Sequence, residues 1–488
     1  MISNNTSSPR DAEWREELRK SVSAKERTSI PRVKMPELDP SYRITCNEEV
    51  NQGLSAEEAV IEARRCMDCP DPQCVTGCPV GINIPGFIKN IERGEFGKAA
   101  IVLKETSALP AVCGRVCPQE KQCESKCLYH KMKRQPVAIG YLERFAADFA
   151  RLNHEECKPE IPESNGIKIA VVGSGPAGLS FAGDMVKKGY DVTVFEALHE
   201  IGGVLKYGIP EFRLPNAVVD VEIDALSQLG VRFRKDCIVG KTFSYDDLHK
   251  MDFKGIFVAS GAGLPRFMGI PGENYIGVMS SNEYLTRINL MGAGHPGNDT
   301  PVLKGDNIAV IGGGNTAMDS VRTARRMGAK NVMLVYRRSE EEMPARAEEI
   351  KHAKEEGVNF MTLCNPVEYL ADEKGRVKTM RVQRMELGEP DASGRRSPVP
   401  IAGAVEEFPV DVVIVSVGVS PNPLIPNAIS DLEVSRRGTI VVNDETLQSS
   451  VNDIYAGGDI VRGGATVILA MGDGRRAAAA MHNALSSI

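Results

Sequence analysis

The sequence predicts an α/β protein in which an N-terminal α-helical iron–sulfur domain precedes two doubly wound dinucleotide-binding domains, the second inserted in the first. Three observations lead to this fold class. Eight of the twelve cysteines fall between Cys66 and Cys127. A unit of strand, glycine-rich turn, helix and strand begins near residue 167 and recurs near residue 308. After the second unit the chain returns to short strands, as expected if it goes back to complete the first nucleotide domain.

The size and charge of the chain exclude several classes of protein. Its 488 residues suffice for about three domains. A net charge of −6 gives no basic footprint for nucleic acid. The longest uncharged run, residues 412–430, contains three prolines and therefore does not predict a membrane span. Residues 10–17 are rich in charge, unlike a secretory signal. We expect a cytoplasmic protein with no membrane span and no nucleic-acid partner.

Composition shifts along the chain predict the domain boundaries. Ser55 and Glu58 have the spacing of a capping box and mark the first expected helix. A bridge rich in glycine, proline and asparagine, residues 287–305, predicts a hinge. The expected divisions are an extended N-terminal arm (1–40), a helical double [4Fe-4S] domain (41–150), a linker (151–166), the first part of the FAD domain (167–300), the NADPH domain (301–415) and the second part of the FAD domain (416–488).

The clustered cysteines predict cofactor ligation. They form two groups in the sequence, Cys66-x2-Cys69-x4-Cys74-x3-Cys78-Pro79 and Cys113-x3-Cys117-Pro118 with Cys123-x3-Cys127. The first group resembles the bacterial ferredoxin pattern C-x2-C-x2-C-x3-C-P, but its middle spacing is longer. Two [4Fe-4S] clusters are therefore expected. Two structural zinc sites are the alternative, although only Cys66 and Cys69 have the C-x2-C spacing typical of zinc. Four lone cysteines are expected to be structural or surface thiols: Cys46, Cys157, Cys237 and Cys364.

The first glycine-rich turn predicts an FAD site. It follows the expected strand 167–172 and opens a helix, so the backbone can approach a pyrophosphate at the helix N-terminus. Glu196 ends the next expected strand, 191–195, where a carboxylate can bond both hydroxyls of a ribose. A glycine-rich turn without a ligand is the alternative. The residues expected to bind FAD here are Gly173, Gly175, Pro176, Ala177, Gly178 and Glu196.

The second glycine-rich turn predicts an NADPH site. At the end of the following strand, 332–336, Arg337 and Arg338 stand where the first copy has an acid. A carboxylate would repel a 2′-phosphate, whereas guanidinium groups bind it, so NADPH is favoured over NADH. A solvated basic turn is the alternative. The residues expected to bind NADP are Gly312, Gly314, Asn315, Thr316, Ala317, Arg337 and Arg338.

A third glycine-rich segment near the C-terminus contributes to the FAD prediction. The expected strand 454–456 ends in Gly-Gly-Asp, which places a carboxylate within reach of a ribitol hydroxyl. The next helix begins with its positive end towards the expected flavin pyrimidine ring, where it would stabilise negative charge. An ordinary strand-to-helix turn is the alternative. This segment adds Gly458, Asp459, Ala465 and Thr466 to the expected FAD site.

Taken together, these motifs resemble the small (beta) chain of NADPH-dependent glutamate synthase. The resemblance extends from about residue 40 to the end, and further motifs that carry it lie at 109–120, 202–203, 207–210, 342–344 and 456–463. The chain is also similar to the large subunit of NADH-dependent reduced ferredoxin:NADP oxidoreductase and to the N-terminal half of dihydropyrimidine dehydrogenase. The resemblance adds Gly203 to the expected FAD site.

The resemblance also implies how the cysteines are shared. One cluster would use Cys66, Cys69, Cys74 and Cys127, and the other would use Cys78, Cys117, Cys123 and either Glu143 or Cys113. In such relatives the last ligand can be a side-chain oxygen from the segment that matches 139–145, where Glu143 stands. A surface helix carboxylate is the alternative for Glu143.

The implied function is that of an NADPH-linked flavin and iron–sulfur oxidoreductase subunit. No catalytic acid, base or nucleophile is expected, because FAD, NADPH and two [4Fe-4S] clusters would carry the chemistry. The implied partner is the larger glutamate synthase subunit. For the electron-bifurcating alternative it is a small subunit with FAD and [2Fe-2S], with ferredoxin as a further partner. A non-redox binding scaffold with zinc sites is the alternative of another class.

Overall fold

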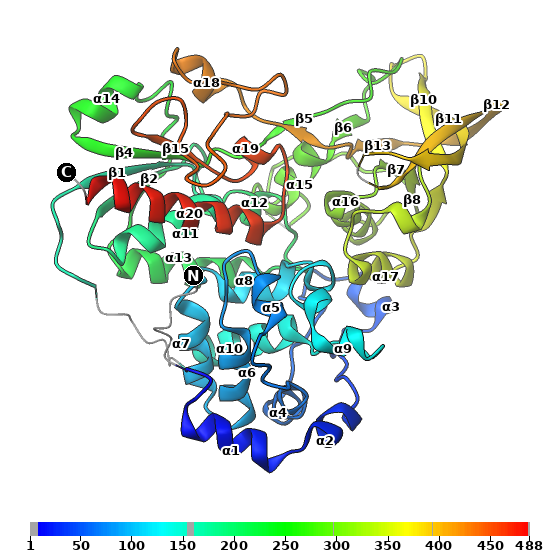
Figure 1. Cartoon of the computed structure of the whole chain (residues 1–488). Coiled ribbons are helices and arrows are strands. Elements are labelled where there is room, and N and C mark those ends of the chain that lie inside the picture. The colour runs from blue at the N-terminus through cyan, green and yellow to red at the C-terminus, as the bar shows by residue number, and fades with distance from the viewer. Residues whose placement is uncertain (1–7, 154–160, 296, 393, 487–488) are drawn as a thin grey trace.

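The structure, a computed structural model, describes residues 8–153, 161–295, 297–392 and 394–486. Cys157, expected to be a lone thiol, lies outside the described residues. A helical region made by the N-terminal third of the chain lies beneath two α/β units (Figure 1). None of the helices in the described ranges combines the length and the apolar character that a membrane crossing requires.

The helical region packs around α10 (Ile139–Leu152). Apolar side chains of α10 contact α8, α7, α6 and α4, and the core that they form continues without a break into the first α/β unit. The capping box at Ser55 and Glu58 is confirmed at the start of α4. The other helices of this region are α3 (Pro40–Arg43), α4 (Ala56–Arg64), α5 (Gln73–Thr76), α6 (Ile84–Glu92), α7 (Phe96–Lys104), α8 (Pro110–Val116), η1 (Gln119–Lys121), η2 (Glu124–Lys126) and α9 (Leu128–Lys131).

The N-terminal arm is not extended throughout, as the sequence analysis expected, but contains two helices. These are α1 (Glu13–Ser21) and α2 (Ala24–Ser29). Arg15 of α1 is 2% exposed and forms a buried ion pair with Asp68, between two of the cysteines. Arg27 of α2 pairs with the buried Glu92 at 2.8 Å. Ser23 and Glu26 form a capping box that starts α2, a local signal to which the sequence analysis gave no weight. The buried ion pairs hold both helices against the cysteine region.

The first α/β unit is a parallel sheet with strand order β15-β4-β1-β2-β3. Its first and last parts come from distant segments, as expected for an interrupted domain. The strands are β1 (Lys168–Val172), β2 (Asp191–Phe195), β3 (Arg232–Arg234), β4 (Phe253–Val258) and β15 (Ile454–Ala456). The helices are α11 (Pro176–Val186), α12 (Val204–Tyr207), α13 (Asn216–Gln228), α14 (Tyr245–Lys250), α18 (Leu424–Ala428), α19 (Asp459–Arg462) and α20 (Val467–Leu485).

The second α/β unit is also parallel, with strand order β6-β13-β7-β8-β9. The strands are β6 (Val278–Ser280), β7 (Asn307–Ile311), β8 (Asn331–Tyr336), β9 (Asn359–Thr362) and β13 (Val412–Val415). The helices are α15 (Ser281–Asn289), α16 (Asn315–Arg326), η3 (Glu340–Glu342) and α17 (Ala347–Glu355).

The insertion point differs from the expected boundary at residue 301. Strand β6 pairs with β13 in the second sheet. The second unit therefore begins before the expected hinge, residues 287–305. The two crossings between the units run side by side as β5 (Leu264–Pro265) and β14 (Val419–Ser420). The sheet to which β6 belongs is decided by its pairing with a strand more than 130 residues away in the sequence. A boundary predicted from local composition therefore fell too late in the chain.

An antiparallel sheet projects from the second unit (Figure 1). It consists of β10 (Cys364–Ala371), β11 (Val377–Pro390) and β12 (Arg396–Pro409), and the sequence analysis did not predict it. Cross-strand ion pairs join β11 to β12, with Arg381 bonded to Glu407 and Arg384 bonded to Glu406.

Buried polar contacts connect the second unit to the rest of the chain. Arg43 of the helical region bonds Glu356 at the end of α17, at 2.8 Å. Arg346 donates to the backbone carbonyl of Arg115, at 2.7 Å. Arg213, from the first unit, pairs with Asp319 of α16 at 2.6 Å. Breaking a buried ion pair or a buried hydrogen bond to a charged group is destabilising, so these contacts hold the three regions in one arrangement.

Candidate functional site

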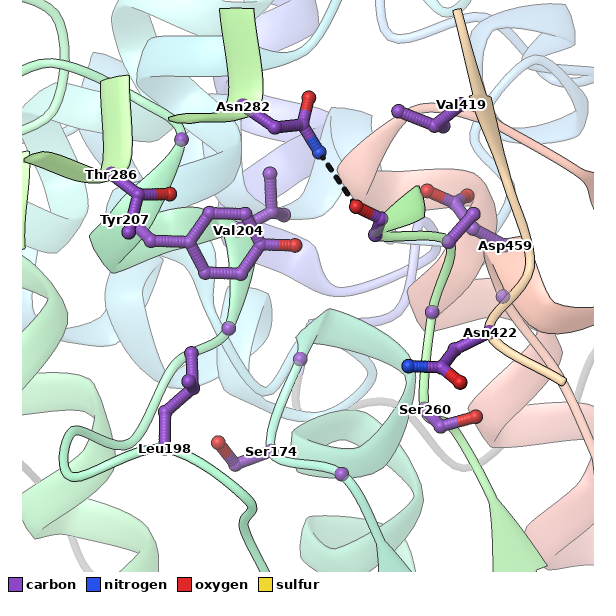
Figure 2. A pocket seen from close by; sticks show the side chains of 18 of the residues that line it. Ser174, Leu198, Val204, Tyr207, Ser260, Asn282, Thr286, Val419, Asn422 and Asp459 are labelled. Carbon is purple, nitrogen blue, oxygen red and sulfur yellow. Dashed lines mark hydrogen bonds between the residues drawn. The ribbon is translucent and has the colours of Figure 1, made fainter. Parts of the chain in front are cut away.

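A cavity of about 1060 Å³ lies where the two α/β units meet. It is lined by the segments that follow β1, β2, β4 and β15, which is where ligands bind parallel sheets. Asn315 and Thr316 of α16 line it from the second unit. Figure 2 shows Ser174, Tyr207 and Asp459 around this space. The cavity therefore joins the two predicted nucleotide turns.

The predicted FAD residues line this cavity, with one exception. The lining set is Gly173, Gly175, Pro176, Ala177, Glu196, Gly203, Gly458, Asp459, Ala465 and Thr466. A Cβ on Gly175 would meet no atom within 4 Å, so the backbone is open to a ligand there. Gly178 instead packs inside the turn, where a Cβ would lie 2.1 Å from the Gly173 carbonyl oxygen. Gly178 thus allows close packing of α11 rather than contact with a ligand.

Glu196 is fixed by the turn that it faces. One carboxylate oxygen accepts hydrogen bonds from the Ser174 amide (2.9 Å) and hydroxyl (2.6 Å), and the other accepts from the Leu198 amide (2.9 Å). The Ser174 hydroxyl oxygen also accepts from the Gly202 amide at 2.9 Å. Ser174 therefore connects the first turn, the acid at the end of β2 and the Gly202–Gly203 segment. The sequence analysis did not assign it a role.

A buried carboxylate holds the C-terminal segment in place. Asp473 of α20 accepts from the Gly458 amide at 3.0 Å and from the Arg462 guanidinium at 2.6 Å. Although burial opposes ionisation, these hydrogen bonds keep the pKa of Asp473 below its ordinary value. Thr466 caps α20, and its hydroxyl accepts from the Leu469 amide. The predicted helix N-terminus is thus present, and Asp473 positions the turn before it.

Tyr207 is a further cavity residue. Figure 2 shows its phenol ring pointing into the cavity from α12, with Asp459 and Val419 on the opposite side. Burial raises the pKa of Tyr207 to about 12, so the phenol stays protonated and can donate a hydrogen bond. The sequence analysis quoted Tyr207 only as part of a motif and gave it no role.

The second turn has the same local geometry as the first, but its two arginines differ from each other. Gly312 follows β7, and a Cβ there would lie 2.3 Å from the Ser416 carbonyl oxygen. Arg337 is exposed and, within the described ranges, has no hydrogen-bond or ion-pair partner. Arg338 is 6% exposed, bonds Asp391 at 2.5 Å and donates to the Arg396 carbonyl at 2.8 Å. Arg338 is therefore held by the projecting sheet, whereas Arg337 is free to meet a ligand.

Two other predicted NADP residues, Gly314 and Ala317, lie at the start of α16. Gly314 is the N-cap residue of this helix, and the Ala317 amide donates a hydrogen bond to the Gly314 carbonyl.

Four cysteines from both sequence groups come together near the surface. This outer set consists of Cys66, Cys69, Cys74 and Cys127. Burial raises the pKa of Cys74, and the thiolate forms of Cys66, Cys127 and Cys69 raise it further, which places all four close to one another. Three of them are partly exposed, the exception being Cys66.

The other clustered cysteines come together in a second set, in which Cys78 is partly exposed and the rest are buried. This inner set consists of Cys78, Cys117 and Cys123, with Cys113 and Glu143 beside them. Glu143 is 5% exposed, and its Oε1 atom has no hydrogen-bond partner in the described part of the chain. Burial, and secondarily Glu222, raises the pKa of Glu143 to about 8. An unpartnered buried carboxyl is costly, which fits a side chain that ligates a metal.

The spacing of these sulfur atoms fits a cluster better than a single ion. No three ligand atoms of either set, as far as the structure describes them, lie all within 4.8 Å of one another. A zinc ion with Zn–S bonds of about 2.3 Å would hold its sulfurs only about 3.8 Å apart. A four-iron core separates its ligands further.

The inner set adjoins the nucleotide cavity. The Cys113 thiol contacts the Met471 sulfur of α20 at 3.5 Å. Gln122, next to Cys123, donates to the Thr466 hydroxyl at 3.4 Å. Helix α20 therefore contacts the cysteine region on one side and contributes to the cavity wall on the other.

Comparison with known proteins agrees with the division of the chain into a cysteine-bearing helical region and two nucleotide-binding α/β units. Residues 43–155 match the family described as dihydropyrimidine dehydrogenase domain II, 4Fe-4S cluster. Residues 167–482 match the pyridine nucleotide-disulphide oxidoreductase family. A similar solved structure is FprA of Mycobacterium tuberculosis in complex with NADPH, with a TM-score of 0.56, 20% identity and coverage of 66% of this chain and 85% of that chain. At this identity the likeness shows the fold alone.

Several curated relatives are more similar in sequence. The glutamate synthase [NADPH] small chain of Azospirillum brasilense is 36% identical over 441 residues, covering 89% of this chain and 90% of the relative. The Escherichia coli (strain K12) small chain is 36% identical over 443 residues, covering 89% and 93%. The NADP(+)-dependent formate dehydrogenase subunit beta of Moorella thermoacetica is 39% identical over 428 residues, covering 83% of this chain but only 59% of that relative.

The fold, the cavity and these relatives lead to the same assignment. The chain is an NAD(P)- and FAD-dependent oxidoreductase with a 4Fe-4S domain. The relatives named above as small chain or subunit beta are parts of multi-subunit enzymes. The chain belongs to the glutamate synthase small-chain family of flavin-dependent oxidoreductases.

Proposed function

We propose that this chain is the electron-entry subunit of a larger enzyme, as the small chain of glutamate synthase is. NADPH would bind at the second turn, FAD at the first turn and one [4Fe-4S] cluster at each cysteine set. When bound, NADPH supplies a hydride, FAD accepts electron pairs and releases single electrons, and the clusters carry single electrons.

The observation that carries this proposal is the path from the cavity to the surface. The inner set adjoins α20, which forms part of the cavity wall, and the outer set follows it towards solvent. Cys123 and Cys127 are four residues apart yet stand in different sets, so the two sets are close neighbours. This arrangement supports transfer through the inner set first and the outer set second.

The cavity residues have binding and positioning roles. Gly175 leaves room for a pyrophosphate, and Glu196 presents a fixed carboxylate to a ribose. The capped N-terminus of α20 offers a positive dipole end where a flavin would become negatively charged on reduction. Tyr207 can donate a hydrogen bond into the same space.

We assign the ligands as the resemblance implies. The outer cluster would be held by Cys66, Cys69, Cys74 and Cys127. The inner cluster would be held by Cys78, Cys117, Cys123 and Glu143, because the Glu143 carboxyl is buried without a partner, whereas the Cys113 thiol already contacts Met471. Glu143 is therefore favoured over Cys113.

Coenzyme choice would depend mainly on Arg337. It is exposed and free at the end of β8, the position where a 2′-phosphate is recognised in this fold. Arg338 is engaged by Asp391 and would act by orienting the turn or by exchanging that partner for phosphate.

The proposal is tested by the variant Cys117→Ser with Cys46→Ser, outside both sets, as control. With loss of the inner cluster confirmed by iron analysis, NADPH should still bleach the flavin absorbance in a stopped-flow trace, because both nucleotide turns are intact. Reduction of the co-purified partner subunit should fall at least about tenfold, whereas the control should behave as wild type. Wild-type partner reduction without the inner cluster would contradict the proposal.

A further inference from the structure

Three side chains that can ligate a metal meet between the N-terminal arm and α17, outside both cysteine sets. One ligand atom from each of Glu37, Glu348 and His352 lies within 4.8 Å of the other two. Within the described residues, no other three histidine, cysteine or carboxylate side chains come this close together. Figure 1 shows α3, which follows the arm, next to α17.

Ordered backbone positions all three side chains. Glu348 and His352 are four residues apart on α17, so they lie on one face of that helix. An isolated β-bridge with Asn51 fixes the backbone of Glu37. Arg43 of α3 donates to the His352 carbonyl at 3.2 Å, which ties the end of the arm to the helix.

The buried member of the trio is His352, which is 1% exposed. Within the described residues, neither of its ring nitrogens makes a hydrogen bond. Its Nε2 atom lies 3.3 Å from a Glu37 carboxylate oxygen, but without the alignment of a hydrogen bond. A buried polar group without a hydrogen bond is costly, and a ligated ion is one of the ordinary ways in which that cost is removed.

The distance between these two atoms is the one expected for two ligands of a zinc ion. Zinc binds histidine nitrogen at about 2.0–2.1 Å and carboxylate oxygen at about 2.0–2.2 Å, so tetrahedral ligands of these kinds lie about 3.3–3.5 Å apart. A histidine with two carboxylates suits zinc or a similar transition-metal ion, whereas Mg²⁺ and Ca²⁺ prefer oxygen ligands alone. Three protein ligands leave a fourth position for water.

The Glu37 carboxylate has a cationic partner that is able to leave. The Lys351 ammonium lies 3.1 and 3.0 Å from its two oxygens, but the lysine side chain is 54% exposed and can extend into solvent. Arg43 lies 4.0 Å from Glu37 and pairs more closely with Glu355 and Glu356, each at 2.8 Å. Lys351 is therefore the cation with which a metal ion would compete.

The Glu348 carboxylate keeps a lone pair for an ion. One of its oxygens accepts from the Arg346 guanidinium at 3.0 Å, and the other accepts from the Asn51 side-chain amide at 3.3 Å. Because each carboxylate oxygen has two lone pairs, the second oxygen can ligate an ion while the first stays bonded to Arg346.

We propose that Glu37, Glu348 and His352 bind one divalent transition-metal ion, for which zinc is the best fit. The ion would join the N-terminal arm to the second α/β unit. The site is independent of the proposed function, because none of the three ligands belongs to a cysteine set or lines the nucleotide cavity. An ion-pair network that holds no metal is the alternative.

The test measures zinc uptake by the intact holoenzyme during equilibrium dialysis against micromolar ZnCl2, with zinc and iron counted in the same samples. His352→Gln and Glu37→Gln each remove a ligand, and Lys351→Gln removes the competing cation. The matched control is His249→Gln. His249 also lies beside a carboxylate, 3.2 Å from Asp453, but within the described residues it belongs to no group of three ligands.

We expect wild type and the control to bind about one zinc per chain, and the two ligand variants to bind it at least about tenfold more weakly. Lys351→Gln should bind zinc at least about threefold more tightly, because it removes a positive charge from the site. The loss of a merely structural residue would not produce such a gain. Since Lys351 is exposed, this variant keeps the proposal testable if a buried variant fails to fold. Excess Mg²⁺ or Ca²⁺ should not displace the zinc.

Three results would overturn the proposal. Negligible zinc uptake by wild type would show an ion-pair network, and equal uptake by wild type and both ligand variants would show adventitious binding only. Unchanged or weaker binding in Lys351→Gln would show that the ion does not compete with this lysine. Zinc that enters only as iron is lost would lie in the cysteine sets and would also contradict the site. Because the two metals are counted separately, the result does not depend on the path of electrons.

Discussion

The outer and inner cysteine sets differ in the charged groups around their thiols. The outer set has cations around it: the Lys89 ammonium donates to the Cys66 carbonyl at 2.6 Å, and Arg19 pairs at 2.6 Å with Asp68, between Cys66 and Cys69. In the inner set Cys117 and Cys123 are buried and Cys78 is partly exposed. Burial, and after it the Glu143 carboxylate, raises the pKa of Cys78 and Cys123, and Glu124 adds to this effect on Cys123 alone. The pKa of Cys117 is raised first by its hydrogen bond with Cys113 and then by burial and Glu143.

If each set holds a cluster as proposed, we expect this difference to give the two sites different affinities for electrons. An added electron makes a cluster more negative, which nearby cations stabilise and nearby carboxylates oppose. We therefore expect a higher reduction potential at the outer site than at the inner one. Electrons that enter from the nucleotide cavity would then move outward with a favourable free energy.

The strongest test of the comparison separates two neighbouring cysteines. Cys123→Ala should remove the inner cluster and Cys127→Ala the outer one, so each variant should retain about four of eight irons. Their electron paramagnetic resonance spectra should lose different signals. Loss of the same signal in both variants would show that the sets are assigned wrongly, and zinc at about two per chain with negligible iron would rule out clusters altogether.

A second variant changes the binding of the electron donor, NADPH, and leaves both cysteine sets unaltered. The variant Arg337→Gln/Arg338→Gln should weaken the binding of NADPH far more than the binding of NADH. The loss of charge-assisted contacts to the 2′-phosphate costs on the order of 2–5 kcal/mol of binding free energy. Steady-state kinetics with both coenzymes measure this. Iron content and cluster potentials should be unchanged, and equal loss with both coenzymes would show that these arginines do not recognise the 2′-phosphate.

A smaller effect tests the charge argument itself. Lys89→Met removes a buried cation beside Cys66, while Arg27 still pairs with Glu92. The outer potential should fall by on the order of tens of millivolts, and the inner potential should stay constant. A redox titration followed by paramagnetic resonance gives both values. An equal shift at both sites would indicate a general structural change instead.

Much of the framework was predictable from sequence because it depends on local patterns. Both glycine-rich turns, the strands around them and the capping box at Ser55 follow from residues close together in the chain. Helix α2 was missed although Ser23 and Glu26 form a capping box at its start, a local signal like the one at Ser55. The buried ion pairs of Arg15 and Arg27 with distant acids, in contrast, could not be predicted from local sequence. Strand β6 was misplaced because its partner β13 lies far away in the sequence.

The candidate site could likewise be predicted only as far as it depends on local sequence. The spacing of the cysteines indicates ligation, but which cysteine joins which set depends on tertiary packing. The isolation of the Glu143 carboxyl and the pairing of Arg338 with Asp391 likewise appear only when distant segments meet. Only the resemblance to known relatives drew attention to Glu143 beforehand.

The central claim is that electrons pass from the cavity through the inner set to the outer set. Rapid freeze-quench paramagnetic resonance after mixing with NADPH tests it directly in the two cysteine variants. With the outer cluster removed by Cys127→Ala, the inner cluster should still become reduced at the wild-type rate. With the inner cluster removed by Cys123→Ala, the outer cluster should remain oxidised on the timescale of turnover. Wild-type reduction of the outer cluster in Cys123→Ala would contradict the account.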